Sequence, residues 1–172
     1  RRSDLQFSAT LYRLDLKGEI VYDNTANLNL NLADTRRRGA ELNLGWESDR
    51  LALSTRWSFV EARFTDGPYA GATVPLVPAA HGVTRLSFKP LSWLEGSLFH
   101  HWYAERYQGN DFSNSFRKIE ASHRFDLRLS AEWKDLTAFL LLHNLLDHNH
   151  APLAFRGAWY PAAGSQWRAG GR

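Results

Sequence analysis

Apolar and polar side chains alternate at every second position through much of this chain. In the clearest stretch, Phe125, Leu127 and Leu129 are separated by Asp126 and Arg128. The same alternation is found at 5–11, 40–46, 51–59 and 136–142. A period of two is that of a β-strand, which turns successive side chains to opposite faces. No segment of comparable length has the helical period. The sequence therefore predicts an all-β protein built from strands with one apolar and one polar face.

The connections between these strands are sorted by length, short and then long. The tight turns are 47–50, 89–92 and 134–135, and the long loops are 65–81, 108–121 and 148–164. An up-and-down antiparallel sheet with such connections has every tight turn at one end and every long loop at the other. Transmembrane β-barrels have this arrangement, with short periplasmic turns and long external loops. A soluble sandwich has no reason for it. We therefore expect an antiparallel, up-and-down transmembrane β-barrel.

About eight strands can be counted, which is the smallest number that closes in outer-membrane barrels. A sheet that spans a membrane must leave no edge facing lipid. The residues alone leave two arrangements open, because the chain either closes by itself or forms an arc of a larger barrel.

The placement of the aromatic residues also favours a membrane location. Trp46, Phe88, Trp93 and Trp133 each lie within a few residues of a tight turn. An interfacial girdle places its amphipathic rings at this level, beside the lipid headgroups. The alternative interpretation is that these are core aromatics at the strand ends of a soluble sheet.

Composition narrows the class further. Hydrophobic residues make up 44% of the 172 residues and charged residues 23%, which is not a disordered composition. The formal charge of +3 is too small to indicate nucleic acid as a partner. Cysteine is absent, which excludes disulfides, a thiol nucleophile and a cysteine-ligated metal. The longest apolar run, 138–142, is too short to span a bilayer as a helix. Methionine is also absent and the chain opens without an apolar leader, so we expect a processed or excised piece.

Four segments resemble motifs of TonB-dependent outer-membrane receptors, in the same order along the chain. The segment 11–23, LYRLDLKGEIVYD, looks like an aromatic strand of that family. The segment 34–46, DTRRRGAELNLGW, resembles the family's R-x-x-G-x-E-L signature. The matching residues of this signature are Arg36, Gly39, Glu41 and Leu42.

The other two segments lie near the end of the chain. HNLLDHNH at 143–150 is similar to the family's penultimate-strand N-L-F-D motif, with Leu146 in place of the usual Phe. WYPAAGSQWRAG at 159–170 resembles the closing Y-P-x-x-G-R-x-W segment, with Ser165 where Arg is common. Family chains finish on an aromatic residue, whereas this one stops at Arg172. The matching residues are Asn144, Leu145, Asp147, Tyr160, Pro161, Gly164 and Trp167.

The resemblance implies that residues 1–172 are the C-terminal part of the β-barrel domain of a 22-stranded plugged transporter. The plug domain would be absent from this chain. The implied function is that of an active transport receptor in the outer membrane of a Gram-negative bacterium, energised through TonB. Its ligand would be scarce and large, with a ferric siderophore first and haem, cobalamin or a metal chelate as alternatives. The implied partners are the plug, the upstream strands, the TonB complex, and outer-membrane lipid with lipopolysaccharide. No cofactor is implied beyond iron in the ligand.

Two functions of other classes stay open on the residues alone. A complete eight-stranded barrel would serve as an anchor, an adhesin or a small pore. An outer-membrane enzyme would need converging groups, and Ser122, His123 and Asp126 are close in sequence. Adjacent strand residues point to opposite faces, so Ser122 and His123 cannot share a site. We therefore expect no enzyme.

The candidate ligand-binding residues combine aromatic rings with cationic groups at the long-loop ends of the strands. Such groups suit a large, flat, anionic ligand. The competing interpretation is an upper aromatic girdle with lipopolysaccharide contacts. The candidates are Trp102, Tyr103, Arg106, Tyr107, Arg117, Lys118, Arg156, Trp159 and Tyr160.

Two further groups carry weaker hypotheses. His148 and His150 have a spacing that suits copper, zinc or haem iron, although ordinary loop histidines are the favoured interpretation. The arginines at 36–38 would lie above the hydrocarbon, where anionic lipopolysaccharide is found, and solvated rim charges are the simplest account of them. Arg37 or Glu41, facing inward, would pair with charges on neighbouring strands.

Overall fold

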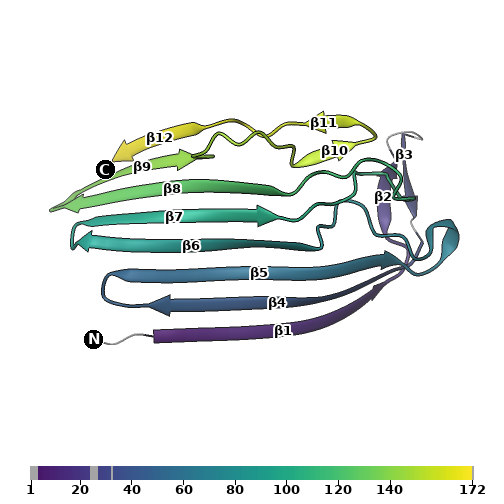
Figure 1. The fold of residues 1–172 in the computed structure, drawn as a ribbon, viewed down its shortest axis with the longest axis horizontal. Coiled ribbons are helices and arrows are strands. Elements are labelled where there is room, and N and C mark those ends of the chain that lie inside the picture. Colours follow the sequence, from purple (N-terminus) through teal and green to yellow (C-terminus); the bar gives the residue numbers. More distant parts are fainter. Residues whose placement is uncertain (1–3, 24–26, 32, 172) are drawn as a thin grey trace.

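The computed structural model describes residues 4–23, 27–31 and 33–171 as an antiparallel sheet with long loops at one end (Figure 1). The eight-stranded sheet follows chain order except for two inserted hairpins. All-β architecture and the count of about eight strands are therefore confirmed. In sheet order the strands are β1 (Asp4–Leu16), β4 (Thr35–Glu47), β5 (Leu51–Phe64), β6 (Ala80–Leu91), β7 (Leu94–Tyr103), β8 (Ser122–Trp133), β9 (Leu136–His143) and β12 (Gln166–Gly171).

The sheet is an open arc. Its order begins with β1 and ends with β12, and these two edge strands do not pair with each other in the described part of the chain. The hypothesis that the chain closes by itself into an eight-stranded barrel is therefore wrong, and the arc is confirmed. Arg172 lies outside the described residues. Within the described ranges, no helix has the length and apolar character needed to cross a bilayer.

Short turns and long loops are at opposite ends of the sheet, as the sorted connections predict. Figure 1 shows the turns after β4, β6 and β8 at one end and the long connections at the other. The loops contain their own local structure, namely η1 (Gly67–Tyr69), the hairpin of β10 (Leu153–Phe155) with β11 (Ala158–Tyr160), and the hairpin of β2 (Ile20–Asp23) with β3 (Leu28–Asn31).

The segment 11–23 is not a single strand, because the chain turns after Leu16. Gly18 has a φ of 61°, a left-handed conformation that glycine adopts without a steric penalty. Its amide donates a 3.3 Å hydrogen bond to a carboxylate oxygen of Asp34. Glu19 then accepts hydrogen bonds from Thr35 and Arg37. Arg37 is therefore paired, but with a residue of the connection between β1 and β2 rather than with the strand charge that was expected.

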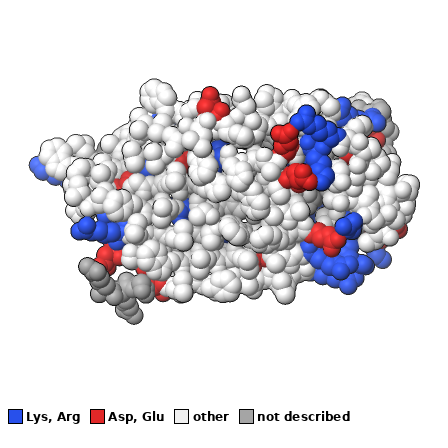
Figure 2. Space-filling model, in the orientation of Figure 1, with Lys and Arg blue, Asp and Glu red and all other residues white. Residues whose placement is uncertain are grey.

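Strand register sorts the side chains into one apolar and one polar face. Leu42 and Leu44 lie on the apolar face with Trp46, as predicted. In Figure 2 this face has a broad, almost uncharged band between charged patches at its ends. One row across the apolar face is Trp46, Leu53, Leu86, Leu98, Leu127 and Leu142, and the matching polar row is Gly45, Ser54, Arg85, Phe99 and Asp126.

The apolar face has no second layer among the described residues. Trp133 is 67% exposed, and Phe88 and Trp93 are about half exposed, all near the short turns. A soluble sandwich would bury these rings against a second sheet. The buried apolar cluster lies instead at the long-loop end, where Ala62 and Phe64 of β5 are covered together with Val74 of the following loop. The soluble-sheet interpretation therefore fails, and lipid is the solvent that suits such a face.

Gly39 of the R-x-x-G-x-E-L segment has a packing role. A Cβ at this position would lie 2.5 Å from the ring of Tyr12 and 2.4 Å from the carbonyl oxygen of Phe59. Only glycine lets the Tyr12 ring lie flat across β4, because any side chain would occupy the same space.

Candidate functional site

The loop between β7 and β8 is fastened to the loop between β5 and β6. Asp111 is 1% exposed and accepts hydrogen bonds from the amides of Ser115 (2.8 Å) and Phe116 (3.1 Å). Asn114 bonds the backbone of Thr73 in both directions, at 2.7 and 2.9 Å. The Asp111 bonds order the turn of the loop itself, and the Asn114 bonds fix this loop against its neighbour. Both follow from the cost of burying polar groups without partners.

Aromatic packing reinforces the same contact. The Phe112 ring lies 6.1 Å from that of Phe64 and 5.6 Å from that of Tyr69. The buried loop cluster therefore extends across both loops.

The loop between β9 and β12 is fastened to the same surface. Gln108 donates to the carbonyl of Arg117 at 2.6 Å and accepts from the amide of Gly157 at 2.8 Å. A Cβ on Gly109 would lie 2.0 Å from the Phe155 ring. Glycine at this position therefore lets the two loops meet.

Arg106 is a buried link between two of these loops. It is 8% exposed, and its Nη2 donates a 2.6 Å hydrogen bond to the carbonyl of Pro152. Burial lowers the pKa of its guanidinium, which nevertheless stays charged. Its Nη1 has no partner among the described residues. Arg106 therefore joins loops in this structure, and a direct ligand contact by it stays a prediction.

The more accessible part of the predicted cluster consists of two cation–aromatic pairs, one between two loops and one within the loop that joins β7 to β8. The Arg117 guanidinium lies 5.7 Å from the Trp159 ring centroid, and the Lys118 ammonium lies 5.0 Å from that of Tyr107. A hydrogen bond from Lys118 to Glu105 raises the pKa of this lysine. Trp159 is 40% exposed, so its ring is open to a ligand.

The β10–β11 hairpin holds the remaining predicted residues. Tyr160 is 51% exposed, and its ring packs edge-on against Phe155 at 6.2 Å. Arg156 lies at the turn of this hairpin with a φ of 45°. The structure thus brings Tyr107, Arg117, Arg156, Trp159 and Tyr160 onto neighbouring loops.

Trp102 and Tyr103 do not form one cluster, which differs from the prediction. They are consecutive residues of β7 and point to opposite faces. Trp102 lies on the apolar face, 6.5 Å from Trp57. Tyr103 lies on the polar face, stacked on His81 at 5.7 Å and beneath Arg106 at 5.7 Å.

The sequence did not predict a hollow that lies on the polar face below the loops. Its volume is about 350 Å³, and Tyr103 lines it together with Glu41, Arg56, His81 and His101. These residues come from four strands and form no local motif. The sequence signal that could have found this hollow is the alternation of polar and apolar residues along each strand, which places all five residues on the inward face.

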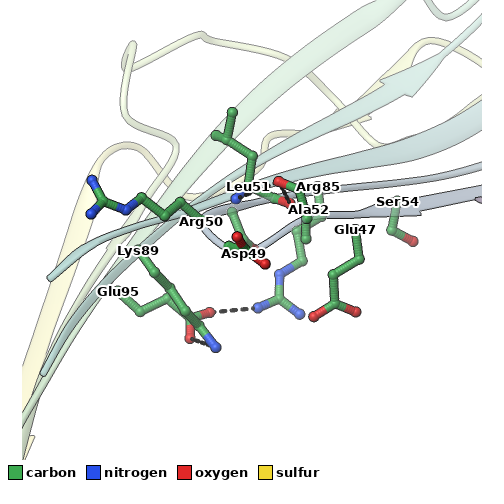
Figure 3. Close-up of a pocket in the computed structure, with 11 residues that line it drawn as sticks. Glu47, Asp49, Arg50, Leu51, Ala52, Ser54, Arg85, Lys89 and Glu95 are labelled. Carbon is green, nitrogen blue, oxygen red and sulfur yellow. Dashed lines mark hydrogen bonds and ion pairs between the residues drawn. The ribbon is translucent and has the colours of Figure 1, made fainter. Parts of the chain in front are cut away.

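A second hollow, of about 220 Å³, lies on the polar face at the short-turn end (Figure 3). Glu95 pairs there with Arg85 at 3.0 Å and with Lys89 at 3.5 Å. Its cations thus face a carboxylate, as do those of the loop surface, where Arg117 pairs with Glu120 and Lys118 with Glu105.

The N-L-F-D segment forms the turn that ends β9. Asn144 is 2% exposed. The backbone amide of Asn144 donates to a carboxylate oxygen of Asp126 at 2.9 Å, and the side-chain oxygen of Asn144 accepts from the backbone amide of His148 at 3.0 Å. Asp147 accepts a 2.8 Å hydrogen bond from the amide of Ser165, at the approach to β12. Trp167 on β12 is 74% exposed.

The histidine and serine candidates are also placed. His148 and His150 stack at 5.7 Å, but no group of three or more His, Asp or Glu suited to a metal ion occurs among the described residues. Ser122 faces inward, 6% exposed. His123 points outward and shares a 3.0 Å hydrogen bond with His100, so the prediction that Ser122 and His123 lie on opposite faces is confirmed.

Comparison with solved structures identifies the fold. The siderophore receptor PiuA from Acinetobacter baumannii superimposes with a TM-score of 0.79 at 19% identity, over 95% of this chain and 25% of that one. The ferric citrate transporter FecA gives 0.80 at 15% identity, over 97% and 28%. The copper transporter OprC gives 0.73 at 16% identity, over 95% and 28%. The chain thus spans about a quarter of the length of these proteins.

Sequence comparison identifies the family. No curated protein matches the sequence. The family model described as TonB dependent receptor-like, beta-barrel, matches residues 1–145. This covers most of the chain and confirms the resemblance drawn from the motifs. The chain therefore belongs to the TonB-dependent receptor family, of whose β-barrel it forms a part.

Proposed function

We propose that this chain forms barrel wall and external loops of an outer-membrane receptor that actively transports a scarce, large ligand. The family is one of transport receptors rather than enzymes. Transport would be energised by the TonB complex acting on a plug domain that lies against the polar face of the arc. The long loops would face the exterior and the short turns the periplasm, in the Gram-negative outer membrane.

A ferric siderophore is the ligand that we propose first. The carrying observation is a pair of cation–aromatic contacts, an exposed one of Arg117 with Trp159 and a half-buried one of Lys118 with Tyr107. Aromatic faces beside cations suit a flat, anionic chelate. The proteins of similar fold are named as a siderophore receptor, a ferric citrate transporter and a copper transporter. Iron would belong to the ligand, and the protein would need no cofactor of its own.

The loops suit this role because they are fixed before a ligand arrives. The bonds of Asn114 to Thr73 and of Gln108 to Gly157 join three loops, and Asp111 orders the turn within one of them. Preorganised loops lose less conformational entropy on binding, which favours affinity for a scarce ligand.

The test uses the intact receptor that contains this chain. Growth under iron limitation is measured on a panel of ferric siderophores, haem and cobalamin, followed by the Kd of the ligand that supports growth. Trp159→Ala and Arg117→Gln should each weaken binding by about tenfold, the order expected for a desolvated cation–aromatic contact.

A matched control exists at the opposite end of the barrel. Lys134 lies 5.1 Å from the Trp133 ring, so Trp133→Ala and Lys134→Gln remove the same chemistry from the short-turn end. These variants should bind the ligand as the parent does. Growth on none of the ligands would refute transport of these classes, and parental affinity of both loop variants would refute the site.

A further inference from the structure

Two histidines on the outward face of β7 and β8 meet through their ring nitrogens. His100 lies on the same side of β7 as Leu98, and His123 lies on the same side of β8 as Phe125, so both point away from the barrel interior. In register, His100 is opposite Phe125 and His123 is opposite Trp102. The two histidines are thus diagonal neighbours across the strand pair, close enough for ring side chains to touch.

The facing nitrogens are within hydrogen-bond distance. His100 Nε2 and His123 Nδ1 are 3.0 Å apart and share a hydrogen bond. The ring planes differ by 7° and the ring centroids lie 5.2 Å apart, so the facing nitrogens are much closer than the ring centres. Phe125 packs on His100 at 4.5 Å, and Trp102 packs on His123 at 6.3 Å. These aromatic rings hold the imidazoles in place.

Carboxylates do not engage this pair. Neither His100 nor His123 forms an ion pair with a residue that the structure describes, whereas His101 and His143 face the carboxylate of Asp126 at 3.3 and 3.5 Å. Ionisable side chains directed at lipid are rare, and they mark functional sites where they occur. A histidine pair on an otherwise apolar face therefore needs a role beyond packing.

The pair lies at the outer end of the strands. His123 is the second residue of β8 and His100 is the fourth from the end of β7, at the end that carries the long loops (Figure 1). Trp57 and Trp102 lie in one row of the same face, 6.5 Å apart, at the level expected of an interfacial girdle. His123 is exposed and His100 is half-buried. A dissolved cation can therefore reach the pair without crossing hydrocarbon.

The spacing of the two nitrogens is that of neighbouring ligands on one metal ion. Imidazole nitrogens at about 2.0–2.1 Å from an ion, with about a right angle between them, lie about 2.9 Å apart. The facing nitrogens are 3.0 Å apart. Both rings must turn for their lone pairs to converge on the ion, and the terminal torsion of histidine is broad enough to allow this. Copper(II) prefers such a tetragonal arrangement and binds nitrogen ligands most tightly among the divalent ions of its row.

We propose that His100 and His123 form a copper(II) site on the outward face of the barrel. The two imidazoles take neighbouring positions and water takes the others. In the neutral pair one facing nitrogen carries the hydrogen that the other accepts. On binding, this hydrogen moves to the remote nitrogen of its own ring, or leaves as a proton where that nitrogen already carries one. The site goes beyond the proposed function, because it faces away from the interior through which a transported ligand passes.

The test measures copper(II) bound by the purified, intact receptor in detergent, prepared without a polyhistidine tag. The probe is copper(II) sulfate with glycine as a competing chelator, and the readouts are the Kd and the electron paramagnetic resonance spectrum. The parent should bind an ion whose spectrum is axial and shows coupling to both imidazoles. His100→Gln/His123→Gln should lose this spectrum and bind at least about tenfold more weakly, a factor that the loss of even an outer partner of a metal site reaches.

The matched control is another adjacent histidine pair. His148 and His150 stack at 5.7 Å, but the Nδ1 of His150 lies 3.1 Å from the carbonyl oxygen of His148. His148→Gln/His150→Gln removes the same number of imidazoles and should bind copper(II) as the parent does. Heat-modifiable migration verifies that each variant is folded.

Three results would overturn the proposal. They are parental affinity of His100→Gln/His123→Gln, an equal or larger loss in the control double variant, and a parental spectrum without coupling to both imidazoles. Should the double variant fail to fold, His123→Gln alone, whose side chain is exposed at the end of β8, decides the matter with an expected loss of at least about tenfold. Parental affinity of this single variant would equally rule the site out.

Discussion

Replacing Leu129 with arginine should destabilise the barrel by about 2–4 kcal/mol, whereas arginine at Ser130 should cost little. Leu129 is on the apolar face in register with Leu140. Ser130 is on the polar face, in register with Glu95 on β7. The two positions are adjacent in sequence, so strand propensity and distance from the turn are nearly the same. The two side chains differ in their surroundings, which are lipid for Leu129 and the wet barrel interior for Ser130.

The depth of Leu129 sets the magnitude. Trp133, at the short-turn girdle, lies four residues away along β8. Four residues span about 13 Å along the strand and about 10 Å of height at a tilt of about 40°, close to the middle of a band about 25 Å tall. A cation at the midplane costs the full free energy of transfer from water into hydrocarbon. An arginine at position 130 would instead have the Glu95 carboxylate beside it.

The assay is reversible urea unfolding of the intact barrel in lipid vesicles, read by tryptophan fluorescence. A shift of midpoint without a change of slope measures the difference in the free energy of unfolding. Equal losses at Leu129 and Ser130 would show that the assigned faces are wrong. A larger loss at Ser130 would reverse them.

Two other predictions concern the whole arrangement. Because the long loops face outward, cysteine introduced at Gly67, Asn114 or Gly157 should react with an impermeant reagent on intact cells. Cysteine introduced at Asp49 or Asp135, in the short turns, should not react. Labelling at Asp49 would show that the orientation is the reverse. Residues 1–172 refolded alone into detergent should aggregate and be rescued by the missing neighbouring strands, and a heat-modifiable, protease-resistant monomer would contradict this.

The sheet could be predicted from the sequence because its faces are set by a period of two. The alternation of Leu127 and Leu129 with Asp126 and Arg128 fixes their faces in any register that keeps apolar residues together. Loop sorting fixed the up-and-down order. Both signals are repeated along the chain, so no single exception obscures them.

The site could be predicted only in part, because its geometry depends on contacts between loops. Asn114 looks like an ordinary polar loop residue, and nothing near it in sequence indicates that it holds two loops together. The same is true of Asp111, which orders the turn that follows it. The burial of Arg106 depends on Pro152, far along the chain. The grouping of Trp102 with Tyr103 neglected the alternation that had correctly separated Ser122 from His123, since β7 continues to Tyr103.

The two edge strands of the arc indicate what else the barrel wall requires. β1 pairs with β4 through thirteen residues, but its other side pairs with no described strand. On this strand Leu11 is 85% exposed and Phe7 is 68% exposed, which shows how little of the edge is covered. In hydrocarbon, each unsatisfied backbone group on such an edge costs several kcal/mol. Closure of β1 onto β12 would instead narrow the interior until side chains fill it, and the inward Arg56, Arg124 and Arg128 would then be forced together with few acids to compensate them. Further strands on both sides remove both costs, so the arc is stable in a membrane only as part of a wider wall.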